Sequence, residues 1–348
     1  MDSVKTLNLD GLVDLAADKV GGIALYASDE FFAGKENLLK PGRGIWIADK
    51  YTDDGKWMDG WESRRKRGPG HDYCILQLGM SGVVHALDID TNYFTGNFPP
   101  YASVDAVCRD DLIGAGPRAL DQAIATLKGT DAGWKEILPK SALQGSSQNV
   151  FSVTSRERWT HLRLNIYPDG GVARLKVHGV VVPNWERFQP HDLVDLLAVE
   201  NGGVALTCND KHYGQPDNLT HPGRSVNMAD GWETKRKRGD LTKPDWAILR
   251  LGHAGHIRKI EVDTNWFKGN YPDRCSIEAA YLPGAGTAEI TAPSVKWTTV
   301  LPESKLQAHT RHYFEKEIAA SGPFTHVRLN IFPDGGVSRL RVHGTLAT

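Results

Sequence analysis

Several features that mark particular protein classes are missing from this sequence. No stretch approaches the roughly 20 apolar residues of a transmembrane helix, and the first residues, MDSVKTLNLDG, lack the apolar core of a signal peptide. Neither charge dominates, because 41 Lys and Arg balance 42 Asp and Glu. Such a chain has no overall field that would recruit nucleic acid or an anionic membrane. We therefore expect a cytoplasmic protein with no nucleic-acid or membrane partner.

Cysteine and nucleophile motifs are equally scarce. The four cysteines form no C-x-x-C pair, which argues against a zinc ribbon or a redox site. G-x-S-x-G, H-E-x-x-H, Walker A and a helix-opening G-x-G-x-x-G are all absent. We therefore predict no covalent enzyme intermediate, and no metal or other cofactor; a divalent cation is conceivable but nothing in the sequence supports it.

What the sequence does contain is a strong internal repeat. LVDLAADKVGGIAL from Leu12 matches LVDLLAVENGGVAL from Leu193, and THLRLNIYPDGGVARLKVHG from Thr160 matches THVRLNIFPDGGVSRLRVHG from Thr325. The offset between copies falls by ten residues after Arg43 and again after Pro99, so copy one carries two insertions. Insertions of this size are tolerated in surface loops. We predict two domains, residues 1–183 and 184–348.

Each copy reads as a set of short strands. In HLRLNIY apolar and polar residues alternate, the period of a half-buried strand, and PDGG supplies turn residues before a second alternating run. This predicts a β-hairpin. DYCILQLG and GVVHALDID are predicted as two further strands, and helix is expected only in LVDLAADKV, in LVDLLAVEN and in RALDQAIATLKG. The predicted fold class is all-β, a tandem of two jelly-roll β-sandwiches.

The most distinctive segment is D-G-W-E-[ST]-x-R-K-R-G, which begins at Asp59 and again at Asp230. Carboxylates beside several cations provide acid–base groups together with an anchor for an anion. A solvated charged turn is an equally good interpretation, with the tryptophan packed beneath it. The site candidates from this motif are Asp59, Glu62, Arg65 and Arg67 in copy one and Glu233, Arg236 and Arg238 in copy two.

The second repeated segment is D-T-N-[YW]-F-x-G-N-[FY]-P. Its carboxylate and amide groups suit a ureido substrate, which has both N–H donors and carbonyl acceptors. The alternatives are a capped turn after a strand and a calcium site, for which the segment has too few acidic residues. The candidates are Asp90, Asn92, Asn97 and Asn265.

The third candidate group lies on the polar face of the predicted hairpin. His161 and Arg163 have counterparts in copy two, of which Arg328 is retained as a candidate. The alternative is a face that is solvated or lies between the two copies.

These doubled motifs, with R-L-N-I-[YF]-P-D-G-G-V-x-R-L, resemble those of the allantoicases, and the resemblance extends from about Leu12 to Gly344. The resemblance implies galactose-binding-like jelly rolls, hydrolysis of allantoate to ureidoglycolate and urea in purine degradation, and a homo-oligomer.

On this basis we assign roles to the candidates as a hypothesis. Arg65 or Arg67, with Arg163, would hold the substrate carboxylate, because a guanidinium binds a carboxylate through two hydrogen bonds. Glu62 and Asp59 would transfer protons, and the asparagines would bind the ureido groups. Two other functions stay open: a ureide hydrolase acting on ureidoglycolate, and a non-catalytic tandem binding module.

Overall fold

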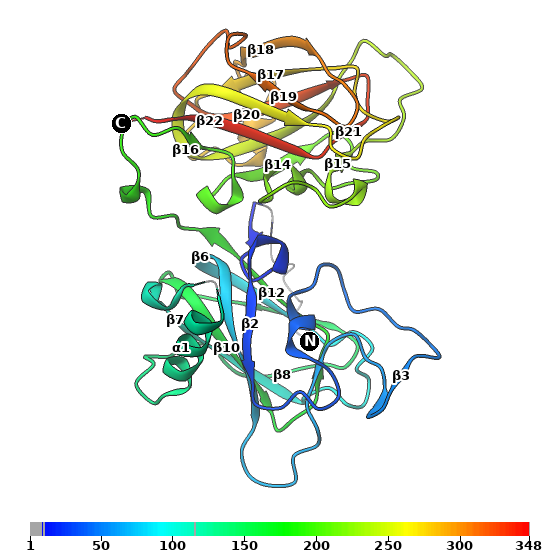
Figure 1. Cartoon of the computed structure of the whole chain (residues 1–348), viewed down its shortest axis with the longest axis vertical. Coiled ribbons are helices and arrows are strands. Elements are labelled where there is room, and N and C mark those ends of the chain that lie inside the picture. The colour runs from blue at the N-terminus through cyan, green and yellow to red at the C-terminus, as the bar shows by residue number, and fades with distance from the viewer. Residues whose placement is uncertain (1–8, 10, 115, 348) are drawn as a thin grey trace. The chain divides into compact units, whose positions relative to one another are not determined.

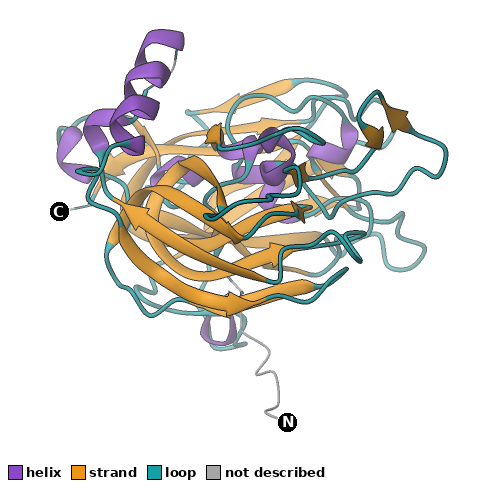
Figure 2. Ribbon diagram, turned by 90° about the horizontal axis from the view of Figure 1, so that it is seen from below, coloured by secondary structure: helices purple, strands orange, loops and turns teal. Residues whose placement is uncertain are grey.

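The computed structural model describes residues 9, 11–114 and 116–347. The chain divides into two compact units, Met1–Val182 and Pro183–Thr348, and both consist mainly of strands (Figure 1, Figure 2). Among the described residues, every helix is too short or too polar to span a lipid bilayer.

In the first unit, one very long strand organises the sheet. The strands are β1 (Val13–Asp14), β2 (Ile23–Ala27), β3 (Tyr51–Thr52), β4 (Gly55–Lys56), β5 (Trp61–Glu62), β6 (Asp72–Asp90), β7 (Tyr101–Val107), β8 (Lys135–Ala142), β9 (Gln148–Ser152), β10 (Arg158–Tyr167), β11 (Gly171–Val172) and β12 (Arg174–Val181). The helices are η1 (Asp18–Val20), η2 (Lys35–Leu39), η3 (Asp110–Leu112) and α1 (Pro117–Lys128). The order β1-β12-β6-β10-β7-β8 is completed by β2 and β9, which both pair with β6.

The two halves of β6 serve different layers of the sandwich. Its first half, around Ile75, pairs with β10 and β2, whereas its second half, around Ile89, pairs with β12 and β9. The sheet folds over along this strand, so that apolar residues of both halves face one interior. Leu162, Leu164 and Ile166 of β10 are fully buried there, as their alternation predicted.

The second unit repeats this arrangement. Its strands are β13 (Val194–Asp195), β14 (Val204–Cys208), β15 (Trp232–Glu233), β16 (Asp245–Asp263), β17 (Arg274–Ala280), β18 (Thr298–Lys305), β19 (Arg311–Phe314), β20 (Phe324–Phe332), β21 (Gly336–Val337) and β22 (Arg339–Leu346). Its helices are η4 (Trp185–Arg187), η5 (Val199–Asn201), η6 (Pro216–Thr220), η7 (Met228–Asp230) and α2 (Thr287–Ile290). The order is β13-β22-β16-β20-β17-β18, with β14 and β19 paired to β16. The predicted fold class, a duplicated jelly-roll sandwich, is confirmed.

Two details of the predicted strands are wrong. β10 and β12 are strands as expected, but they do not form a hairpin, because each pairs with a different half of β6. DYCILQLG and GVVHALDID are one continuous strand rather than two, since β6 passes from one layer to the other without a turn.

Of the three predicted helices, one is confirmed and two are wrong. The segment RALDQAIATLKG forms α1, which packs Ala123 and Leu127 onto the outer face of the sheet beside Ile75. LVDLAADKV, in contrast, contains the short strand β1 and a single 3-10 turn, and LVDLLAVEN likewise. The other copy-one insertion forms the projecting β3–β4 loop (Figure 1).

Candidate functional site: a matched pocket in each unit

In the first unit, three loops meet at one end of the sandwich and enclose a cavity of about 600 Å³. They meet because β6 begins, β7 begins and β10 ends at the same level of the sheet, where Ile166 lies opposite Asp72 and Tyr167 opposite Tyr101. The lining residues are Phe32, Glu62, Ser63, Arg65, Lys66, Gly96, Asn97, Phe98, Pro100, Pro168, Asp169 and Gly170.

A small two-stranded sheet fixes the loop that carries the charged motif. Trp61 and Glu62 of β5 pair with Val172 and Gly171 of β11. The Trp61 ring is fully buried and its Nε1 donates a hydrogen bond to the carbonyl of Asp29 at 2.8 Å, so it packs beneath the loop as predicted. A Cβ at Gly171 would lie 2.0 Å from the ring of Phe94, so only glycine allows this close approach.

Glu62 is the pocket carboxyl group whose pKa is changed by its surroundings. It is only 8% exposed, and its Oε1 accepts a hydrogen bond of 2.7 Å from Nδ2 of Asn97. Burial raises the pKa of Glu62, and the hydrogen bond from Asn97 opposes that rise only in part. A carboxyl group in this environment is suited to donating a proton at a higher pH than an exposed glutamate.

The two cations that line the cavity differ in their partners. Lys66 is engaged, since its Nζ lies 2.9 Å from Oδ1 of Asp72. Its backbone N–H donates a 2.8 Å hydrogen bond to Oδ2 of Asp169. Arg65 is exposed, and among the described residues no hydrogen bond or ion pair holds its guanidinium. That guanidinium is therefore available to an anionic ligand.

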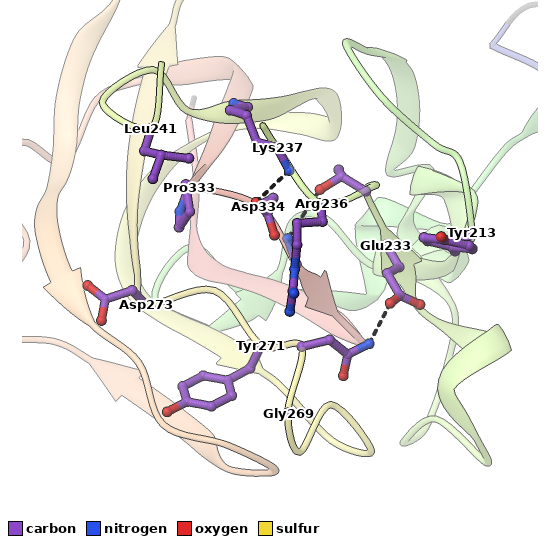
Figure 3. A pocket seen from close by; sticks show the side chains of 13 residues that line it. Tyr213, Glu233, Arg236, Lys237, Leu241, Gly269, Tyr271, Asp273, Pro333 and Asp334 are labelled. Atoms are coloured by element: carbon purple, nitrogen blue, oxygen red, sulfur yellow. Dashed lines mark hydrogen bonds between the residues drawn. The ribbon is translucent and has the colours of Figure 1, made fainter. Parts of the chain in front are cut away.

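The second unit carries the corresponding cavity, of about 620 Å³, with the same contacts. Nδ2 of Asn270 donates a hydrogen bond to Oε1 of Glu233, and burial raises the pKa of Glu233. Figure 3 shows Arg236 in the middle of this cavity, between Glu233 on one side and Tyr271 on the other. The backbone N–H of Lys237 donates a 2.8 Å hydrogen bond to Oδ2 of Asp334.

Asp59 is not brought to the cavity, although it lies three residues before Glu62. Its carboxylate is 8% exposed and forms an ion pair with Arg174, with Nη2 and Oδ2 2.6 Å apart. It also accepts a 3.0 Å hydrogen bond from the backbone of Ile45. Asp59 thus ties the start of the motif to β12, and its Oδ2 is engaged by both of these contacts.

Asp90, Asn92 and Asn265 also serve the fold. Asp90 accepts two hydrogen bonds from the Arg43 guanidinium, at 2.7 and 2.8 Å, and one from its neighbour Asn92. The Asn92 amide donates to the carbonyl of Gly44, and Asn265 donates to Ser225 in the same way. This is the capped turn that was one of the three interpretations of the motif.

His161, Arg163 and Arg328 lie on the outer face of their sheets, away from the cavity loops. Nε and Nη2 of Arg163 donate to Asp105 at 3.0 and 2.9 Å, and the guanidinium stacks over the ring of Trp134. Arg328 repeats this arrangement on Glu278 and Trp297. His161 is fully buried, whereas the Arg163 side chain is 31% exposed, so this polar face is only partly solvated.

The last arginines of the charged motif are exposed. Arg67 does not line the cavity of its unit. Arg238 contributes to a smaller depression of about 350 Å³ that it shares with Asp245. Of the predicted site residues, the structure therefore brings together Glu62, Arg65 and Asn97 in unit one and Glu233 and Arg236 in unit two.

Several lining residues were missed from the sequence, chief among them the second carboxylate, Asp169, with its counterpart Asp334. Both belong to PDGG, which was interpreted only as a turn. Their repetition in both copies was the signal that could have identified them. Within the described residues, no group of three or more His, Cys, Asp or Glu side chains is arranged to hold a metal ion.

The fold and the two matched cavities define a duplicated β-sandwich protein with a small, charged pocket in each repeat. A family model described as "Allantoicase repeat" matches residues 13–182 and 194–347. The chain belongs to the allantoicase family.

Individual relatives agree with this assignment. An allantoicase of Dictyostelium discoideum is 48% identical, with 96% of this chain and 87% of that protein covered. A probable allantoicase of Burkholderia mallei is 50% identical, with 96% and 94% covered. The crystal structure of allantoicase from Saccharomyces cerevisiae has a TM-score of 0.78 at 36% identity, with 96% and 93% covered.

Proposed function

We propose that this protein hydrolyses allantoate to ureidoglycolate and urea in a pocket of this kind, which the first unit builds around Glu62. The observation that carries the proposal is the pairing, in one cavity, of a buried glutamate of raised pKa with a guanidinium that no group in the described part of the chain holds. The family's name supplies the substrate, and the pocket supplies groups that suit it.

Allantoate carries one carboxylate and two ureido groups on a single carbon. The pocket offers a binding partner for each of these chemical groups. Arg65 anchors the carboxylate through two charge-assisted hydrogen bonds. Asn97 holds Glu62 in position through their 2.7 Å hydrogen bond, leaving the second carboxyl oxygen free to carry the proton. Ser63 and Asp169 on the cavity wall are hydrogen-bonding groups for the ureido arms.

The reaction then proceeds without a covalent enzyme intermediate. Glu62 protonates the nitrogen of the departing urea while the lone pair of the other ureido nitrogen forms a C=N bond and the C–N bond to urea breaks. Water adds to the same carbon and returns its proton to Glu62, which gives ureidoglycolate. One group therefore acts first as acid and then as base, so Asp59 is not required.

Substitution of the glutamates tests the acid–base role. Urea release from allantoate should fall about 10²-fold or more in a Glu62→Gln/Glu233→Gln variant, the usual scale of general acid–base catalysis. In the parent, kcat/KM should decline as pH rises through the raised pKa of these groups, because the protonated form is lost. Ureidoglycolate is the rival substrate in the same urea assay. Undiminished turnover by the variant would remove the glutamates from the mechanism, and no urea from allantoate would refute the function.

Substitution of the two pocket arginines tests the carboxylate anchor. Arg65→Ala/Arg236→Ala should raise KM roughly 10- to 100-fold, the loss expected for hydrogen bonds to a charged group worth about 1.5–3 kcal/mol. The matched control is Arg64→Ala/Lys235→Ala in the same motif, whose side chains pair with Asp29 and Asp210 instead. Equal KM values for the two double variants would show that the anchor lies elsewhere.

The resemblance to the family also supports a homo-oligomer, and the cytoplasmic location expected from the sequence stays a proposal beside it. Sedimentation of the purified protein tests the first point, and fractionation of cells tests the second. A monomer, or a protein found outside the cytoplasm, would contradict them.

A further inference from the structure

Each unit contains the complete set of groups that the proposed mechanism uses. Three groups recur at corresponding positions in both cavities: the glutamate that accepts from an asparagine, the aspartate that accepts from a backbone N–H, and an exposed arginine whose guanidinium has no partner among residues 9, 11–114 and 116–347. Ion pairs of 2.9 Å, Lys66 with Asp72 and Lys237 with Asp245, recur as well.

The shared fold alone does not require this set. Packing accounts for the buried tryptophan and for the glycines, which would be kept in a purely structural copy. A glutamate of raised pKa, in contrast, costs stability at neutral pH because its charged form is poorly solvated. An exposed arginine without a partner contributes nothing to packing. Both features are present in both units, which points to a use for each.

We infer that each unit is a separate active site for the same small ureido acid, so that one chain holds two sites. The inference rests on the proposed function and extends it, because the function requires only one working pocket. The two cavities have similar volumes, about 600 and 620 Å³, and each contains its own acid and its own anchor, so neither unit needs a residue from the other.

The two pockets differ in some wall residues, but the glutamate, the arginine and the aspartate occupy corresponding positions in both. Tyr213 and Tyr271 of unit two stand where unit one has Phe32 and Phe98. Asp273 also lines the second pocket, and its charge is balanced by ion pairs to Arg274 and Lys305. In both cavities the arginine is therefore the lining cation that stays available to the substrate carboxylate, as far as the described residues show.

Single and double glutamate variants of the full-length chain test the inference. Glu62→Gln alone and Glu233→Gln alone should each retain a substantial part of the parent's urea release, about half if the sites turn over equally. The double variant should lose about 10²-fold or more. If one single variant is already as inactive as the double variant, only one unit is catalytic and the inference fails.

Binding stoichiometry provides a second readout that does not depend on turnover. Calorimetric titration of allantoate into the slow Glu62→Gln/Glu233→Gln variant should give two molecules per chain. Adding Arg65→Ala or Arg236→Ala should reduce the number to one at the same ligand concentrations, with thermal unfolding confirming the fold. One molecule per chain before that change would overturn the inference. Failure of the proposed function is distinguishable, because the parent would then release no urea from allantoate.

Discussion

At the scale of single residues, His161 and His326 show how burial changes the chemistry of an ordinary side chain. Both side chains are fully buried, and Nδ1 of each lies 2.9 Å from the hydroxyl of the preceding threonine. Burial, assisted by the nearby Arg109 and Arg250 respectively, lowers the pKa of each histidine from 6.5 to about 4. Both histidines are therefore neutral at physiological pH.

This shift makes a prediction about stability in acid. Since the pKa is lower in the folded state than in the unfolded state, the unfolded chain binds more protons below pH 6.5. The free energy of unfolding should therefore fall as the pH decreases from about 6.5 toward 4, by on the order of 2–3 kcal/mol per histidine. Denaturant unfolding curves across this range measure the effect.

The variant His161→Gln/His326→Gln should lose less stability over the same pH range, whatever its stability at neutral pH. The exposed His191 provides the control variant, His191→Gln, measured over the same pH range. Parallel slopes for the parent and the double variant would contradict the linkage.

Which site residues were predictable from the sequence depended on where their partners lie. Repetition of the charged motif pointed to Glu62 and Arg65, and both line the pocket. The same repetition pointed to Asp59, whose partner Arg174 is 115 residues away in the chain. Nothing local in the motif distinguishes a carboxylate that an arginine will neutralise from one that faces a cavity.

At the scale of elements, the alternation of residues predicted strands correctly but not their pairing. The period of two in β10 and β12 tells which face of each strand is buried. It carries no information about neighbours, and these two strands join different halves of β6. The short PDGG link suggested a hairpin because a turn between the two layers of the sandwich and a turn between paired strands use the same residues.

The length of β6 was also hidden from the sequence. Its central Gly79 and Gly82 resemble a turn, whereas in the structure they allow close contact with the backbone of Val20 and of Val180. α1 was easier to predict, because Pro117 stands at its first turn and its apolar side meets a cluster that includes Leu25 and Val107. Local signals therefore sufficed for local elements only.

At the scale of the whole molecule, the repeat leads to a prediction about independent folding. The core of the second unit consists entirely of residues from Leu196 to Val342, including both halves of β16. A chain of about 165 residues that closes its own core is large enough to be stable by itself. We therefore expect residues 184–348, produced alone, to unfold in one cooperative thermal transition.

A matched fragment gives this experiment its control. A chain that begins at residue 209 lacks β13 and β14, and so loses the strands that pair with β22 and with the first half of β16. The core side chains of Leu196 and Leu197 would be missing, and the backbone edges of β22 and β16 would be exposed. This fragment should therefore show no cooperative transition. Cooperative unfolding of the shorter fragment, or none in 184–348, would show that the repeat is not the unit of folding.

Because the second pocket is built entirely from residues 213–335, a folded 184–348 fragment should also bind allantoate, with an affinity that Arg236→Ala reduces.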